Sequence, residues 1–186
     1  MKVLDTRLMD VLLIEPKRFG DYRGFFAETY HRRTYSSLGV DVEFVQDNHS
    51  LSASVGTVRG LHFQAHPHAQ AKLVRCGRGA IFDVAVDIRL GSPTYGKWAG
   101  FTLIAANGAQ LYIPAGFAHG FVTLEADSEI VYKCSDYYAP EAGGALRWDD
   151  PAIGIDWPII EDAILSDKDV KAPLLTDLCS PFAFEG

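Results

Sequence analysis

The sequence predicts an all-β fold, a jelly-roll barrel built from short antiparallel strands. Short runs rich in β-branched and aromatic residues recur along the chain, as strands require. Clusters of Gly, Pro, Asn and Asp separate these runs, among them RCGRG, RLGSPTYG, AANGA, IPAGF and LEADS, and such clusters are typical of turns between strands. Helical periodicity is rare, so we expect only short helices at the periphery.

Each expected strand is a run with period-two alternation or continuous apolar character. The runs are residues 8–14, 25–30, 42–46, 71–75, 80–88, 97–103, 110–113, 120–124 and 130–134, together with the strand-like segment VRGLHFQ at 58–64. The clearest is 80–88, where Phe82, Val84 and Val86 share one face and Asp83 and Asp87 the other. One face should pack in the core, and the other should meet a pocket or solvent.

The remaining segments give few structural signals. The stretch HRRTYSSLG predicts a short helix closed by Gly39, and residues 158–163 predict a turn or two before LSDKD. No linker or internal repeat interrupts the chain. We therefore expect one domain, with an N-terminal strand-bearing arm at about 1–50, the barrel at about 51–138, and a C-terminal segment at about 139–186 wrapped against it.

Length and composition limit the function classes. A chain of 186 residues with 48% hydrophobic content can bury one core. Its net charge of −7 argues against a nucleic-acid partner. No apolar run is long enough to span a bilayer, and the N-terminal segment lacks the pattern of a secretory signal. Cys76, Cys134 and Cys179 are few and widely spaced, which favours a reducing cytoplasm.

Two segments place histidines where a barrel cavity would need them. VRGLHFQ contains His62, and YIPAGFAHGF contains His119 after a Pro-Gly turn. Together they resemble the two halves of a cupin-type barrel, but Gln64 occupies the second position of the His-x-His pair that a metal site would use. A facial metal site needs at least three convergent donors. QAHPHAQ has a His-x-His pair, but Pro67 indicates a loop. The pattern favours proton chemistry, with no metal or cofactor.

Seven segments, in order, give a more specific indication. FGDYRGFFAETY, FVQDNHS, VRGLHFQ, KLVRCGRGAIFDVAVDIR, IPAGFAHGF, YKCSDYYAPE and LSDKD resemble the dTDP-4-dehydrorhamnose 3,5-epimerase family, the RmlC-type sugar nucleotide epimerases. The resemblance covers nearly the entire chain. It implies a cupin-like jelly-roll fold and cofactor-independent epimerisation of dTDP-4-dehydro-6-deoxy-D-glucose at C3 and C5, giving dTDP-4-dehydro-L-rhamnose.

Such a reaction needs a base, an acid and a group that stabilises an enolate, because the C–H bonds flanking a ketone are acidified by it. His62 is the natural base, since an imidazole titrates near neutral pH. The resemblance implies that Asp169 orients His62, that Tyr132 is the acid, and that Lys72 lies beside the ketone oxygen. Strand alternation places Tyr132 on the same face as Ile130.

The resemblance also implies contacts with the rest of the substrate and with a partner subunit. The N-terminal arm would cross to the partner and hold the thymine, so that each site needs two chains and the protein is a homodimer. The implied binding residues are Arg59, His119 and Lys168 for the diphosphate, Arg23, Phe26 and Glu28 from the arm, and Gln46, Asp47 and Asn48 for further nucleotide or sugar contacts.

Several alternatives stay open at this point. Asp83 either supports the His62 region or balances a buried positive charge. In the segment EAGGAL many relatives have an acidic residue near the position of Gly143, so one contact is missing unless Glu141 replaces it. The function alternatives are a single-site 3- or 5-epimerase acting on a related dTDP-4-keto-6-deoxysugar, and a metal-dependent cupin enzyme.

Overall fold

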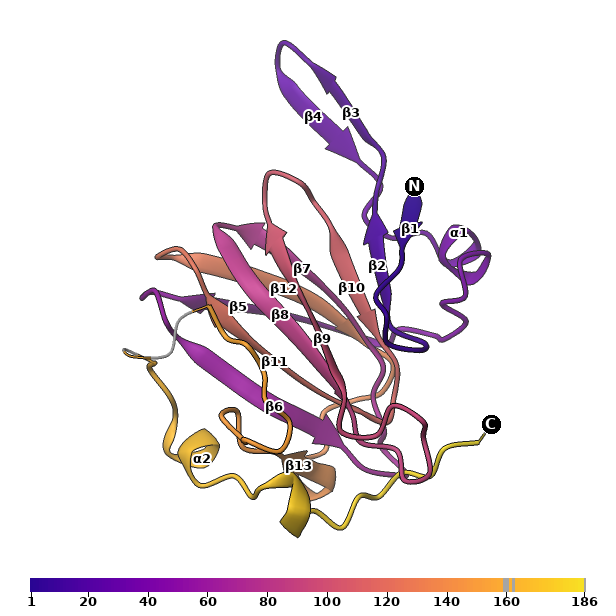
Figure 1. Ribbon diagram of the computed structural model, residues 1–186. Coiled ribbons are helices and arrows are strands. Elements are labelled where there is room, and N and C mark those ends of the chain that lie inside the picture. The colour runs from indigo at the N-terminus through magenta and orange to yellow at the C-terminus, as the bar shows by residue number, and fades with distance from the viewer. Residues whose placement is uncertain (159–160, 162, 186) are drawn as a thin grey trace.

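The computed structural model describes residues 1–158, 161 and 163–185, and strands dominate it (Figure 1). The helical elements are short and lie outside the sheets: α1 (Arg32–Ser36), α2 (Asp167–Val170) and the 3-10 turns η1 (Pro140–Ala142) and η2 (Leu175–Asp177). The strands are β1 (Lys2–Leu4), β2 (Leu12–Glu15), β3 (Arg18–Asp21), β4 (Gly24–Ala27), β5 (Gln46–Ser52), β6 (Val58–Gln64), β7 (Lys72–Arg78), β8 (Ala80–Asp87), β9 (Trp98–Ile104), β10 (Gln110–Ile113), β11 (Phe117–Thr123), β12 (Ser128–Cys134) and β13 (Gly143–Ala145). The predicted all-β fold with short peripheral helices is confirmed.

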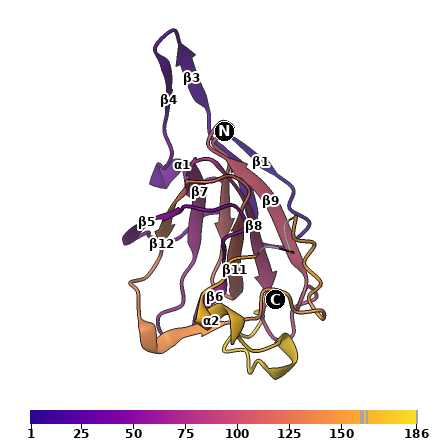
Figure 2. The same ribbon diagram turned by 90° about the vertical axis from the view of Figure 1, so that its left-hand side faces the viewer.

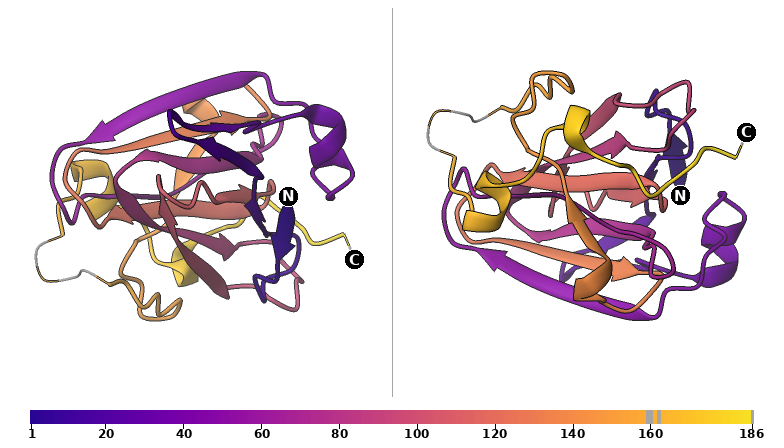
Figure 3. Two further views of the ribbon diagram at one scale, coloured as in Figure 1. Left: turned by 90° about the horizontal axis from the view of Figure 1, so that it is seen from above. Right: turned by 90° about the horizontal axis from the view of Figure 1, so that it is seen from below.

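Two antiparallel sheets form the body of the molecule (Figures 1 and 3). One has six strands in the order β1-β2-β10-β7-β12-β5, and the other has five in the order β13-β6-β11-β8-β9. Strands distant in sequence are neighbours in both sheets, as in a jelly roll. A cavity between the two sheets is therefore lined by residues from many parts of the chain.

The two strands β3 and β4 form a hairpin that projects away from both sheets (Figures 1 and 2). Arg18 at its base donates hydrogen bonds to the backbone carbonyls of Ala105 and Ala106, and its guanidinium lies 4.0 Å from the centre of the Phe25 ring. The hairpin also presents exposed aromatic rings, including that of Phe26. Its base is thus fixed to the body while its tip reaches beyond it.

The core consists of three clusters of buried apolar residues, and each cluster covers a face of a sheet. Val74, Ile81, Leu111 and Ile130 belong to the first, between the two sheets. The second joins the outer face of the five-stranded sheet to the C-terminal segment, which Figure 3 shows in orange to yellow, through Val58, Val84, Val86, Trp148, Trp157 and Phe182. The third places Tyr35 of α1 on Ile14, Leu73 and Tyr112 of the six-stranded sheet. Tertiary packing, more than local propensity, stabilises helices this short.

The largest error in the predicted strands concerns residues 42–46. The strand in this region is β5, which only begins at Gln46 and continues to Ser52. Its inward residues are polar because they line a cavity, so the apolar alternation that marks an ordinary strand is missing. Val42 and Phe44 are apolar for another reason, since they pack against the cluster around α1.

Other boundaries also differ from the predictions. The predicted strand at 8–14 begins only at Leu12, because positive φ angles at Arg7 and Asp10 make the preceding chain turn. The segment 141–146, treated as a loop, contains β13, which pairs with β6. The predicted short helix is confirmed as α1, but its C-cap is Ser37, and Gly39 lies two residues further on with a positive φ. Half of the predicted turn at 158–163, namely residues 159, 160 and 162, lies outside the residues that the structure describes.

Both faces of β8 are buried, whereas the sequence predicted that one of them would meet a pocket or solvent. The polar face carries Asp83 and Asp87, and both are completely inaccessible. Burial opposes ionisation of Asp87, but hydrogen bonds from Arg89, Ser92 and Thr94 outweigh it and lower the pKa of the carboxyl group. Asp87 is thus a satisfied structural carboxylate at the end of the strand.

Over the residues described, none of the helices has the length and apolar character needed to cross a membrane.

Candidate active site

A two-part cavity lies between β6 and β11 of one sheet and β5, β7 and β12 of the other. The two parts have volumes of about 440 and about 410 Å³, and both are lined by His62, Lys72 and Tyr132. The first part extends toward Thr57 and α2. The second extends past Gln46 to β13. Cavities of this size accommodate small organic ligands, and here titratable side chains lie at the junction.

A bulge in β6 turns two side chains into the cavity that simple alternation would place on opposite faces. The pairing with β11 shifts between His119, which faces His62, and Phe121, which faces Arg59. Arg59 and His62 consequently both line the first part of the cavity. The shift needs a close approach of the backbones at Gly60, where a Cβ atom would lie 2.6 Å from the carbonyl oxygen of His119.

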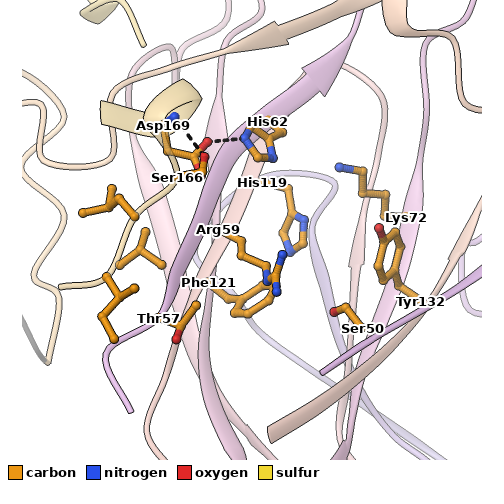
Figure 4. Close-up of a pocket in the computed structure, with 13 residues that line it drawn as sticks. Ser50, Thr57, Arg59, His62, Lys72, His119, Phe121, Tyr132, Ser166 and Asp169 are labelled. Carbon is orange, nitrogen blue, oxygen red and sulfur yellow. Dashed lines mark hydrogen bonds and ion pairs between the residues drawn. The ribbon is translucent and has the colours of Figure 1, made fainter. Parts of the chain in front are cut away.

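His62 and Asp169, separated by most of the chain, form a hydrogen-bonded pair. The distance from His62 Nε2 to Asp169 Oδ1 is 2.5 Å, and the Asp169 side chain is only 4% exposed. Asp169 lies on α2, whose N-cap residue Ser166 donates to Asp169 Oδ2 at 2.9 Å. Figure 4 shows this chain of contacts on one wall of the cavity. The helix cap therefore fixes the carboxylate, and the carboxylate fixes the imidazole.

The pairing determines the chemistry available to His62. An ionised carboxylate can only accept, so Nε2 holds the ring proton and Nδ1 is left for the cavity. Burial lowers the pKa of His62, the hydrogen bond that His62 donates to Asp169 opposes this, and the charges of Lys72 and Lys168 add to the lowering. A lowered pKa keeps the imidazole neutral near pH 7, which is the form that can accept a proton.

Lys72 and Tyr132 approach from the opposite sheet (Figure 4). Burial lowers the pKa of Lys72, while nearby Cys134 and Asp83 oppose the change. Burial also raises the pKa of Tyr132, with Cys134 adding to the rise and Arg59 opposing it. The phenol is therefore protonated at neutral pH and can act as a proton donor. The cavity thus places a neutral base and a phenolic acid on facing walls, with an amine beside the phenol.

The residues expected to bind a diphosphate also lie at the cavity. Arg59 donates to the Ser52 hydroxyl at 3.2 Å and to the Leu51 carbonyl at 3.3 Å, which orients its guanidinium. His119 lines the first part of the cavity, and Lys168 lines the second. Cationic side chains on several walls suit an anionic ligand.

Side chains along β5 alternate between the two faces of the sheet, so the predicted binding residues do not all face the cavity. Gln46 and Asn48 face the cavity, where the Gln46 amide donates to the Asn48 side chain at 3.1 Å. Asp47 faces outward and accepts from Lys133 Nζ at 2.9 Å. The structure does not bring the Asp47 side chain into the cavity, because neighbouring residues of a strand point to opposite faces.

Within one chain, the predicted arm residues lie away from the cavity. Arg23 and Phe26 are on the projecting hairpin, and Glu28 follows it (Figure 2). The Arg23 guanidinium donates to Asp21, and the Phe26 ring is 70% exposed. None of the three lines the cavity described above.

Comparisons with known proteins identify the family. The family model for dTDP-4-dehydrorhamnose 3,5-epimerase matches residues 5–177. This chain belongs to the dTDP-4-dehydrorhamnose 3,5-epimerase family. The family member from Sinorhizobium fredii is 56% identical over 96% of this chain and 90% of its own length, and the one from Salmonella typhimurium is 55% identical over 94% and 96%.

Solved structures agree with this assignment. The crystal structure of the RmlC epimerase from Legionella pneumophila, in complex with dTDP-4-keto-L-rhamnose, superposes with a TM-score of 0.95 at 45% identity, covering 100% of this chain and 99% of that chain. The cupin-like fold expected from the sequence is thereby confirmed.

Sequence reasoning missed several residues that line the cavity of this epimerase-family chain. Alternation from Gln46 and Asn48 would have predicted Ser50. The interval between Ser166 and Asp169 is that of an N-cap and its third residue, a readable signal for the Ser166 contact. No sequence signal points to Tyr138, whose exposed ring lies at the second part of the cavity.

Gln64 occupies the position where a cupin metal site would have a ligand, and its side chain is hydrogen-bonded to the backbone. It donates to the carbonyls of His68 and Tyr137 and accepts from the Ala139 amide. His66 and His68 lie in a loop, as predicted, and His68 contacts Asp136. Among the described residues, no three His, Cys, Asp or Glu side chains gather as a ligand set.

At Gly143 the resemblance to the family led us to expect an acidic residue. Gly143 lines the second part of the cavity. Glu141, the candidate replacement for a carboxylate there, lines an adjoining hollow beside His66 and Cys179. The structure therefore does not place the Glu141 side chain where it would substitute for an acidic residue at position 143.

Proposed function

We propose that this protein catalyses the cofactor-independent epimerisation of dTDP-4-dehydro-6-deoxy-D-glucose at C3 and C5, giving dTDP-4-dehydro-L-rhamnose. One observation carries the proposal most strongly: a His62–Asp169 pair faces Tyr132 and Lys72 across a single cavity. The dTDP-4-keto-L-rhamnose bound by the Legionella relative is the product of this reaction. Epimerisation only exchanges protons, so this reaction needs no oxidant.

The reaction begins with proton abstraction. His62 Nδ1 takes the proton from a carbon next to the ketone, the C–H electron pair forms the C=C bond of an enolate, and Nε2 remains bonded to Asp169. Asp169 stabilises the imidazolium that forms. The ammonium of Lys72 stabilises the negative charge that develops on the ketone oxygen, a contribution of about 3–4 kcal/mol when such a donor is well placed.

Reprotonation inverts the carbon. Tyr132 lies on the wall opposite His62, so its phenol delivers a proton to the other face of the enolate. The phenolate then takes a proton from solvent, and the imidazolium of His62 releases its proton to solvent. The same steps at the second flanking carbon complete the double inversion.

The nucleotide part would be held by cations and amides. Arg59 and Lys168 supply charge for the diphosphate, His119 supplies a ring nitrogen, and Gln46 and Asn48 supply polar contacts. These donors hold the sugar at the junction of the two parts of the cavity, where the reacting groups meet.

We also propose a cytoplasmic location and a single domain; the three cysteines, all unpaired, fit a reducing compartment.

An isotope experiment tests the reaction. Incubating the purified protein with the 4-keto-6-deoxyglucose nucleotide in D₂O should label the product at both C3 and C5, because each carbon passes through an enolate. Mass spectrometry and NMR would locate the deuterium. The chelator-treated protein should label both carbons at the same rate. Label at one carbon only would establish the single-site alternative, and a rate that required added metal would contradict the mechanism.

We propose that the protein is a homodimer with exchanged N-terminal hairpins. The support is that Arg23 and Phe26 are exposed on a projecting hairpin, out of reach of the cavity in their own chain. Hydrophobic rings on such an extension need a surface to cover them. The exchange would bring Arg23 to the diphosphate, Phe26 to the thymine ring and Glu28 to the edge of the base.

Mixing two defective variants tests the exchange. His62→Ala chains lack the base, and Arg23→Ala/Phe26→Ala chains lack the arm contacts. After unfolding and refolding together, mixed dimers should contain one site with both an intact base and an intact arm, so roughly a quarter of wild-type activity should return. Sedimentation velocity would confirm that the mixture is dimeric. Absence of recovery in a dimeric mixture would show that each arm serves its own chain or no site.

A further inference from the structure

The carboxylate of Asp169 has one hydrogen-bond donor on each of its oxygens, and the mechanism above uses only the first. Oδ1 is 2.5 Å from His62 Nε2, and Oδ2 accepts from the Ser166 hydroxyl at 2.9 Å. The Asp169 side chain is only 4% exposed, so solvent has little access to either oxygen. A buried carboxylate needs such donors in place of water. The Ser166 hydroxyl is therefore a built part of the site.

The five-stranded sheet holds another histidine–carboxylate pair, and that pair lacks a third member. His119 Nε2 is 2.7 Å from Asp83 Oδ1. Asp83 Oδ2 has no hydrogen-bond partner among the described residues. Asp83 thus supports His119, and the carboxylate that supports His62 is held at both of its oxygens.

The Ser166 hydroxyl holds the Asp169 carboxylate from a fixed piece of backbone. As the N-cap of α2, Ser166 Oγ also accepts from the Asp169 amide at 3.3 Å. Two residues before it, the Ile164 carbonyl accepts from the Val58 amide at 2.9 Å. Val58 begins β6, the strand that carries His62. The hydroxyl therefore places the carboxylate relative to the strand on which the imidazole lies.

We propose that Ser166 is a positioning residue for epimerisation, whose hydroxyl turns the Asp169 carboxylate so that Oδ1 accepts from His62 Nε2. This rests on the proposed function, in which His62 removes the substrate proton. Without the hydroxyl, the carboxylate can rotate about its bond to the β-carbon, and the imidazole loses the fixed partner that holds Nδ1 toward the cavity. Proton abstraction then slows, while nucleotide binding, which uses other residues, is unchanged.

Substitutions at Ser166 separate the contact with Asp169 from the support of the helix. Glycine is nearly as good an N-cap as serine but has no hydroxyl to donate. Ser166→Gly should lower kcat about tenfold, the loss of one hydrogen bond to a charged group, and leave dTDP affinity within about twofold. Ser166→Thr keeps the hydroxyl and should keep kcat within about twofold of the wild type. Steady-state kinetics and calorimetry with dTDP measure these quantities in the full-length protein.

Ser166→Ala is the structural control, because it removes the cap as well as the hydroxyl. It should have a lower Tm than Ser166→Gly but the same kcat at 25 °C. If kcat instead follows Tm across the three variants, the hydroxyl only supports the helix. If Ser166→Gly raises KM and leaves kcat unchanged, the hydroxyl contacts the substrate. Either result would overturn the proposal.

A double substitution tests whether the effect passes through Asp169. In an Asp169→Asn background, adding Ser166→Gly should change kcat less than about twofold, because the carboxylate that the hydroxyl orients is already gone. An equal loss in both backgrounds would contradict the proposal. Wild-type protein that exchanges no substrate hydrogen in D₂O would instead overturn the proposed function, so the two failures are distinguishable.

Discussion

Replacing His62 with alanine is expected to lower turnover by about 10³-fold or more, within the range that general bases contribute. His62 is the cavity imidazole that is paired with Asp169 and lies on the wall opposite the phenol of Tyr132. Deuterium exchange at C3 and C5 should disappear together with product formation. Affinity for dTDP should stay close to that of the wild type, since His62 acts on the sugar carbons.

The control for this experiment keeps the ring and removes its charged partner. Asp169→Asn leaves an amide beside Nε2, and loss of the correct tautomer should make the variant nearly as slow as His62→Ala. Wild-type turnover in either protein, with dTDP binding intact, would mean that another group removes the proton.

Replacing Tyr132 with phenylalanine is expected to reduce net epimerisation by about 10²-fold or more while exchange with D₂O continues. The phenyl ring preserves the packing but has no proton to give to the far face of the enolate. His62 can still remove a proton and return a deuteron to the same face. The product of this variant should therefore be mostly labelled starting material.

The ratio of exchange to product, measured in one reaction by NMR, separates this outcome from a general loss of activity. In the wild type, exchange and product should be comparable. If Tyr132→Phe slows both equally, the phenol takes part in binding or in the first step, and the assignment of the acid is incorrect.

The sequence predicted the all-β architecture and most strands of the barrel because their alternation directly reports burial. It failed at β5, where the inward face is polar. The placement of Tyr132 and Ile130 on one strand face followed from alternation alone. The same rule would have assigned Asp47 to the outer face and Ser50 to the cavity had the strand been recognised.

Long-range pairings could not be derived from the residues themselves. His62 and Asp169 are brought together by the C-terminal segment and α2, and no local pattern encodes their distance. Resemblance to a family supplied that pair. It did not supply Asp83 and His119, because a fully buried aspartate on a strand has several possible partners and only coordinates select one.

The bulge in β6 makes two residues without reactive side chains important for turnover. Gly60 and Gly120 face each other where the strands shift register, and neither leaves room for a methyl group. They have no side chain to donate, accept or titrate, yet their close approach allows Arg59 and His62, three positions apart in the chain, to face the same cavity. A list of essential residues that considers only reactive side chains would omit both glycines. Replacing either glycine would nevertheless move Arg59 and His62 out of their positions in the cavity.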